Sequence, residues 1–218
     1  MATFPGESWS IVWLSLRVSG TAVLLAALLG IPLGTVIGLS RSRLQAWFSV
    51  LVHTGMALPP VVVGLLLYLL LSRSGPLSFL GWLFTPKAMI LAQTILALPF
   101  VTGITMTALA SVPAELSAQL RSLGASPWQC RWALLREARR GVLLAISAAF
   151  GRSLSEVGAV LIVGGNIQGH TRVLTTAIVL ETGKGEFALA VALGGALLSL
   201  ALVVNALMIW LQGGRVAP

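Results

Sequence analysis

The segment SAQLRSLGASPWQCRWALLREARR, from Ser117 to Arg140, is a charged interruption in the middle of an otherwise apolar chain. Of the 218 residues, 57% are hydrophobic and only 9% are charged, whereas about 25% are charged in an ordinary soluble domain. Because a soluble domain of this size could not bury so much apolar surface, the composition predicts an integral membrane protein. Burying the charges of residues 111–140 in a bilayer would cost on the order of 20 kcal/mol, so we expect this stretch to lie in water.

Five apolar segments are long enough to cross a hydrocarbon core of about 30 Å. We expect these spans at Arg17–Leu39, Phe48–Leu71, Lys87–Ala110, Val142–Val163 and Ala188–Leu211. The sequence therefore predicts an all-α, polytopic membrane protein that forms a single domain over residues 1–218, with the lipid bilayer as its surroundings. Five helices make a thin wall for a pore, and a symmetric homodimer would place ten around a central path.

Basic residues indicate the orientation of the spans. One set shares a side of the membrane if all five helices cross: Arg41, Arg43, Arg121, Arg131, Arg136, Arg139, Arg140 and Arg215. The positive-inside rule places this side in the cytoplasm, with the N-terminus outside and the C-terminus inside. The positive charges are scattered between apolar runs and do not cluster as in a binding groove, so the net charge of +8 does not predict a nucleic-acid partner.

Residues 111–140 are expected to fold as a helix–turn–helix. Ser111 is expected to cap a first helix that has Pro113 and Glu115 in its first turn. An apolar face follows from the spacing of Leu116, Leu120 and Leu123. Such a protruding element suits docking to another protein, but its arginines also suit contact with anionic lipid, and physical reasoning alone leaves both interpretations open.

The turn between these two helices is expected at Gly124, in a left-handed conformation that ends the first helix. Ser126 and Pro127 then form a cap followed by proline and begin the second helix. The expected apolar face of that second helix consists of Trp128, Trp132 and Leu135.

The run Leu123-Gly124-Ala125-Ser126 resembles the "LGAS" core of the coupling loop in membrane subunits of ABC importers. The stretches SLRVSGTAVLLAALLGIPLGTVIGL and ALPPVVVGLLL resemble the first two spans of the molybdate, sulfate and tungstate branch. GRSLSEVGAVLIVGGNIQGHTRVLTTAIVLETGKGEFALAVALG is especially similar to tungstate-type permeases. The chain departs from the family pattern with Ala118-Gln119-Leu120 in place of Glu-Ala-Ala, and with Leu135-Arg136 in place of Leu-Pro.

This resemblance implies a type I ABC-importer permease fold in the cytoplasmic membrane of a bacterium or archaeon, with residues 111–140 as the cytoplasmic coupling loop. Its implied partners are two cytoplasmic ABC ATPase subunits, an external substrate-binding protein and a second copy of the chain. Its implied cargo is a tetrahedral oxyanion, tungstate first and molybdate next. The residues implied to couple to the ATPase are Glu115, Ala118, Arg121, Leu123, Gly124, Ala125 and Ser126.

No phosphate-binding loop, catalytic constellation, metal-ligand cluster or cofactor motif is evident, so the protein is not expected to be an enzyme. The segment Thr182–Glu186 contains Gly-Lys but lacks the upstream glycine and the following Ser or Thr of such a loop. ATP hydrolysis would therefore belong to a separate subunit. The alternative is an ATP-independent secondary transporter or channel for an anion, although the internal repeats common in such proteins are absent.

Four residues are candidates for the translocation path within the spans. Pro59 and Pro60 are expected to bend the second span. Arg152 and Glu156 stand four residues apart in the fourth span, where we expect an ion pair on one helix face, about 15 Å deep. Such a pair either locks the helix to its neighbour or faces a watery path.

Further polar and glycine residues of interest lie in the outer segment after the fourth span and in the first and third spans. Asn166 and Thr171 belong to a Gly-rich outer segment, and Thr171–Thr182 could form a short helix at the outer mouth or an ordinary solvated loop. Gln93 is expected to form a hydrogen bond across helices. The four-residue spacing of Gly30, Gly34 and Gly38 predicts a face of close helix packing.

Overall fold

The computed structural model describes residues 5–40 and 44–211. In this part of the chain all regular structure is helical, which confirms the all-α prediction. The elements are α1 (Pro5–Gly38), α2 (Leu44–Met56), α3 (Pro60–Leu71), the short 3-10 helix η1 (Ser78–Leu80), α4 (Pro86–Ala110), α5 (Ala114–Ser122), α6 (Pro127–Glu137), α7 (Arg139–Leu154), α8 (Gly158–Gly164), α9 (Leu174–Gly183) and α10 (Phe187–Leu211). Three residues used to predict the orientation lie outside the described residues: Arg41, Arg43 and Arg215.

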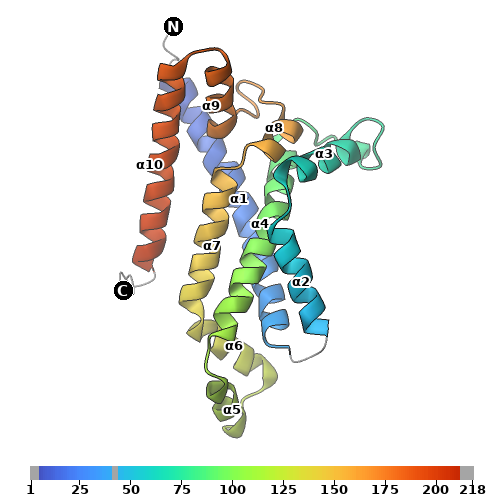
Figure 1. Ribbon diagram of the computed structural model, residues 1–218, viewed down its shortest axis with the longest axis vertical. Coiled ribbons are helices and arrows are strands. Elements are labelled where there is room, and N and C mark those ends of the chain that lie inside the picture. Colours follow the sequence, from blue (N-terminus) through green and yellow to red (C-terminus); the bar gives the residue numbers. More distant parts are fainter. Residues whose placement is uncertain (1–4, 41–43, 212–218) are drawn as a thin grey trace.

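Three of the described helices, α1, α4 and α10, are long and apolar enough to cross a membrane unbroken, and the count rises to five if each of two bent pairs forms one span. The bent pairs are α2 with α3, at 92°, and α7 with α8, at 57°. The bend expected in the second span is therefore present, whereas the sequence analysis was wrong to expect one continuous helix in the fourth span. Figure 1 shows α3 running crosswise to the other helices at the end of α2.

The proline pair explains the sharper bend. Pro59 adopts an extended conformation, with φ −68° and ψ 122°, and Pro60 begins α3. Neither residue has a backbone N–H, so the hydrogen bonds that would continue α2 into α3 cannot form there. The predicted bend at this pair is confirmed, and it divides the span.

The glycine face of α1 packs closely on α4, as the four-residue spacing predicts. A Cβ atom added to Gly34 would lie 2.6 Å from the carbonyl oxygen of Thr102 and 2.9 Å from the Cβ of Thr105. One added to Gly30 would lie 3.0 Å from the Cβ of Val101. The two longest helices of the core thus meet along their backbones.

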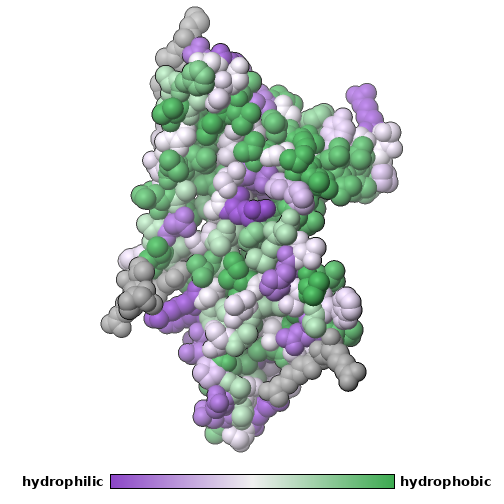
Figure 2. All heavy atoms as spheres, viewed as in Figure 1, coloured by the Kyte–Doolittle hydropathy of each residue, from purple (hydrophilic) through white to green (hydrophobic). Residues whose placement is uncertain are grey.

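The packed core centres on α4, and the periphery remains apolar. One cluster of buried side chains joins α4 to α3 and α8, and a second joins α4 to α1 and α7. Helix α10 instead presents large exposed side chains, among them Val191, Leu198 and Leu202. Figure 2 shows hydrophobic residues over most of α10 and α3. Such uncovered apolar surface suits lipid or another membrane helix.

Candidate coupling surface and transmembrane site

Helices α5 and α6 project from one end of the bundle, opposite the end at which α1 and α10 begin (Figure 1). Helix α6 starts with the predicted cap: the hydroxyl of Ser126 accepts a hydrogen bond from the Gln129 amide at 3.3 Å, and the Gln129 side chain accepts one from the Ser126 amide at 2.7 Å. This reciprocal capping box satisfies two amides that have no partner within the helix.

The prediction that Ser111 caps α5 was wrong. Ser111 ends α4, and its hydroxyl donates to the Ala108 carbonyl at 2.8 Å. Pro113 occupies the N-cap position of α5, and its side chain accepts no hydrogen bond from the amides of the first turn. The hydroxyl of Ser111 therefore satisfies a carbonyl in the last turn of the preceding helix, two residues before α5 is capped.

Gly124 makes the turn between α5 and α6, as predicted, with φ +81°. Its amide donates to the Arg121 carbonyl at 3.0 Å, and the Ala125 amide donates to the Leu120 carbonyl at 3.0 Å. This pair of bonds closes the end of a helix around one left-handed residue. No atom lies within 4 Å of a Cβ built on Gly124, so the backbone conformation alone requires glycine.

The protrusion has a packed inner face and an open outer face. Cys130 and Leu134 are each only 5% exposed, and Leu134 packs with Leu109 of α4. By contrast, Trp128 is 73% and Trp132 is 56% exposed. The residues of the predicted apolar face of α6 lie on its outer side, with Trp128 and Trp132 exposed and Leu135 half-buried. The sequence analysis missed the inner face that packs, although the four-residue spacing of Cys130 and Leu134 was its signal.

The expected coupling residues lie on the exposed part of this protrusion. Leu123 at its tip is 83% exposed. Glu115, Ala118, Arg121, Gly124 and Ser126 are also exposed, and Ala125 is half-buried. The structure therefore places the predicted residues from Arg121 to Ser126 at one turn, with Ala118 in the helix before it and Glu115 at the start of that helix.

The transmembrane candidates Arg152 and Glu156 do not form the expected ion pair. Helix α7 ends at Leu154, so the two residues do not share a helix face. A carboxylate oxygen of Glu156 instead accepts the Ala159 amide at 3.0 Å and so caps the first turn of α8. The ion pair found in the described residues joins Lys184 to Glu181, at 2.9 Å.

Arg152 lies against an aromatic ring of the central helix. Its Cζ is 4.7 Å from the ring centroid of Phe100, a cation–π distance, and its buried Nε has no hydrogen-bond partner. Figure 2 shows a strongly hydrophilic patch near the height of the α7–α8 junction, with hydrophobic residues next to it. The structure thus leaves Arg152 without an ion pair to a carboxylate of the described residues, beside the break of the fourth span.

Hydrogen bonds from distant segments hold this break. Gln93 of α4 donates to the Ser153 carbonyl at 2.8 Å, which confirms the predicted bond across helices, and its Oε1 is buried without a partner. Thr175 of α9 donates to the Glu156 carbonyl at 2.9 Å. The sequence analysis missed Ser153 and Thr175, because a hydroxyl residue or a free carbonyl in an apolar run does not show which segment it meets.

The outer segment is ordered by its own polar groups. The hydroxyl of Thr171 donates to the Gly164 carbonyl at 2.6 Å and accepts from the Ile167 amide at 2.9 Å. Asn166, at φ +51°, donates to the Thr176 carbonyl at 3.3 Å. Of the two alternatives for residues 171–182, a short helix or a solvated loop, the helix is present as α9, which begins at Leu174. Asn166 and Thr171 therefore shape the loop that leads into α9.

A protein-family model described as "Binding-protein-dependent transport system inner membrane component" matches residues 30–214. The chain belongs to this family. The described helices, with a protruding α5–α6 pair and two broken spans, are therefore those of an inner membrane transport component.

Curated relatives of this transport component include permeases named for anions. It is 40% identical over 97% of its length, and 93% of the relative, to the tungstate uptake system permease protein TupB of Peptoclostridium acidaminophilum. It is 47% identical to a probable anion ABC transporter permease protein of Haloferax volcanii, with 91% and 88% of the two chains covered. It is also 32% identical to the molybdenum transport system permease protein ModB of Escherichia coli K12, with 82% of each chain covered.

Solved structures show the fold. The transport component matches an inward-facing conformation of the MetNI methionine ABC transporter with a TM-score of 0.73, at 20% identity and 97% and 96% coverage. It matches an amino acid ABC transporter crystallised with histidines with a TM-score of 0.71, at 16% identity and 99% and 100% coverage. The expected type I ABC-importer permease fold is confirmed.

Proposed function

We propose that this protein is the membrane-spanning subunit of an ATP-driven importer for a tetrahedral oxyanion, with tungstate as the first candidate and molybdate the next. The cargo proposal is supported by the near full-length similarity to TupB, and the weaker similarity to ModB extends it to molybdate. An ATP-independent transporter or channel is the alternative, and family membership argues against it.

The observation that carries the ATP-driven part of the proposal is the open outer face of α5 and α6. Leu123 next to the turn at Gly124, and Trp128 and Trp132 along α6, are exposed, so an apolar side chain can enter a groove of a partner as an anchor. We propose that each protrusion docks to one of two cytoplasmic ATPase subunits, and that the complete importer contains two copies of this chain and an external substrate-binding protein.

The proposed orientation places α5 and α6 in the cytoplasm, with the N-terminus outside and the C-terminus inside. It is supported by arginines on or beside the protrusion: Arg121, Arg131, Arg136, Arg139 and Arg140. In this orientation α9 belongs to the outer mouth, and Asn166 and Thr171 support its entry loop.

The proposed translocation path for the cargo runs past the bend between α2 and α3 and the break between α7 and α8. The bend at Pro59 and Pro60 and the break beside Arg152 and Glu156 supply the non-helical backbone that membrane proteins tolerate only beside protein or a watery cavity. The unpaired Arg152 would attract an anion there, because its charge is not cancelled by Glu156.

The test is to express this chain with the ATPase and binding protein encoded beside it, to purify the complex through this chain, and to measure uptake of labelled tungstate in proteoliposomes. We expect the ATPase to co-elute, uptake to require ATP, and molybdate to compete better than sulfate. Equal competition by sulfate would refute the tungstate assignment, and uptake without any ATPase would refute the importer.

A further inference from the structure

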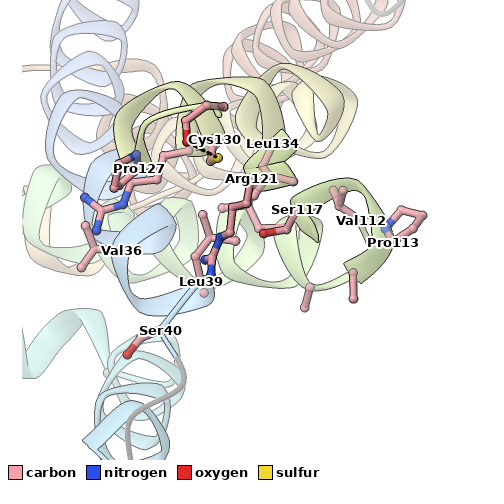
Figure 3. A pocket seen from close by; sticks show the side chains of 16 residues that line it. Val36, Leu39, Ser40, Val112, Pro113, Ser117, Arg121, Pro127, Cys130 and Leu134 are labelled. Atoms are coloured by element: carbon pink, nitrogen blue, oxygen red, sulfur yellow. Dashed lines mark hydrogen bonds between the residues drawn. The ribbon is translucent and has the colours of Figure 1, made fainter. Parts of the chain in front are cut away.

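A cavity of about 670 Å³ lies between the α5–α6 protrusion and the ends of the membrane helices, beside the contact of Leu134 with Leu109. It lies between the last turn of α1, the end of α4, and α5 and α6, and its wall includes Leu39, Val112 and Leu134 (Figure 3). The charged residues in the wall are Arg121 and Arg131, with no carboxylate among the lining residues. Figure 3 shows Arg121 extending across the opening toward Leu39.

The two arginines are not neutralised inside the protein. Neither guanidinium forms an ion pair with a carboxylate of the described residues. The cavity also stands at the level where apolar α1 and α4 give way to the polar protrusion, which is the level of the phosphates in a bilayer. A concave site with two uncompensated cations at this depth is suited to a phosphate group.

An apolar groove of about 580 Å³ adjoins this cavity. It runs between α1, α2 and α4, and its lining is apolar apart from Ser40, Gln45 and Thr102. Val36 and Ser40 line both the groove and the basic cavity, so the two spaces meet at the end of α1. The groove thus continues from a phosphate-sized basic site into the apolar part of the bundle.

We propose that the basic cavity and the apolar groove together bind one anionic phospholipid. Its phosphate lies between Arg121 and Arg131, and one acyl chain lies in the groove against Phe48, Leu51 and Leu98. A free oxyanion would use only the basic half, and a helix of a second copy would use only the apolar half. A single phospholipid matches both chemistries in the order in which they adjoin.

This lipid would contact α4, which leads into the protrusion, but not α7, which leads out of it. It would bridge α1, α2 and α4 on one side to α5 and α6 on the other, and so hold the protrusion at a fixed angle to the bundle. The inference depends on α5 and α6 lying at the membrane surface, and it does not depend on the cargo or on the ATPase.

The test uses the full-length protein in phosphatidylcholine nanodiscs, titrated with phosphatidylglycerol that has a photoactivatable diazirine in its acyl chain. We expect cross-links in residues 44–58 and 95–102. Replacing both arginines, Arg121→Gln with Arg131→Gln, should weaken labelling about 30-fold, since each basic residue near an anionic lipid contributes a factor of about five. Leu51→Asn, which places an amide on the exposed groove wall, should also reduce labelling.

The matched control is Arg139→Gln with Arg140→Gln, which removes the same charge from exposed positions of α7 that line neither space and should leave labelling unchanged. Equal labelling by a phosphatidylcholine probe, or unchanged labelling after loss of Arg121 and Arg131, would overturn the proposal. Displacement of the probe by millimolar inorganic phosphate or tungstate would assign the cavity to a free anion. A disulfide between two Leu51→Cys copies would assign the groove to a dimer interface.

Discussion

The side chain of Gln93 donates a 2.8 Å hydrogen bond to the carbonyl of Ser153, the residue that follows Arg152 in α7. This bond joins the central helix α4 to the last turn before the fourth span breaks. Gln93 is only 3% exposed, so water cannot replace the lost donor readily. A contact between segments 60 residues apart thus helps to hold the turn of α7 that carries Arg152, together with a weaker bond from the Ser19 hydroxyl to the same carbonyl at 3.4 Å.

Removing the bond between Gln93 and Ser153 should destabilise the folded protein at the break between α7 and α8. We expect Gln93→Leu to reduce the free energy of unfolding by about 1 kcal/mol, the net value of a typical buried hydrogen bond. Thermal unfolding in detergent would measure the change. Thr107→Val, which removes a hydroxyl bonded within α4 itself, is the control and should have a smaller effect. An unchanged melting temperature for Gln93→Leu would show that Ser153 does not depend on this donor.

The charge of Arg152 should matter for transport more than for assembly. We expect Arg152→Gln to lower the maximal uptake rate of the reconstituted importer at least tenfold, because the proposed path would lose its unpaired cation, and Arg152→Lys to retain part of the rate. Arg73→Gln, which removes an exposed charge after α3, is the control. Normal uptake by Arg152→Gln would assign Arg152 a purely structural role beside Phe100.

Trp128 should be an anchor for the ATPase. We expect Trp128→Ala to weaken binding of the ATPase about 30-fold or more without lowering the melting temperature, because the side chain is 73% exposed in the isolated subunit. Trp9→Ala is the control, since Trp9 is 74% exposed at the opposite end of the bundle. Co-purification and titration of the ATPase would measure both variants, and equal effects would refute docking at the protrusion.

Two substitutions of Gly124 distinguish the effect of its backbone conformation on stability from the effect of the surface shape on docking. Gly124→Ala should destabilise the protrusion by about 1 kcal/mol, because alanine is disfavoured at φ +81° although no atom blocks its Cβ. Gly124→Arg adds a large side chain at the same φ and should abolish co-elution of the ATPase. If Gly124→Arg assembled and transported normally, the turn could not be part of the docking surface.

The close approach of α1 and α4 makes Gly34 intolerant of any side chain. Gly34→Ala would place its Cβ 2.6 Å from the Thr102 carbonyl oxygen, so the helices must separate at a cost of about 1–3 kcal/mol. Gly20→Ala on the same helix is the control, because no atom lies within 4 Å of its Cβ. We expect only Gly34→Ala to lower the melting temperature.

The orientation can be tested by thiol labelling, but native Cys130 is a poor reporter because it is 5% exposed. In a Cys130→Ser background, Leu123→Cys should react with an impermeant maleimide only in inside-out vesicles. Glu186→Cys, in the exposed turn before α10, should react only from outside intact cells. The reverse pattern would invert the proposed topology.

Local patterns in the sequence were sufficient for much of the fold. The apolar runs predicted the membrane segments, and the Ser126 cap and Gly124 turn predicted the end of one helix and the start of the next. These features depend on residues within one or two turns of each other, so neighbouring side chains decide them. Pro59 and Pro60 likewise predicted where the second span bends, although not the 92° angle.

The amino-acid sequence by itself determined that this is a helical membrane protein with one charged protrusion, because the long apolar runs favour lipid and the many charges of residues 111–140 would be too costly to bury there however the helices pack. Only the tertiary structure decided that Glu156 caps α8 and leaves Arg152 unpaired, that Gln93 reaches Ser153, and that a basic cavity meets an apolar groove. These relationships join segments far apart in the chain, so their geometry depends on how the helices pack.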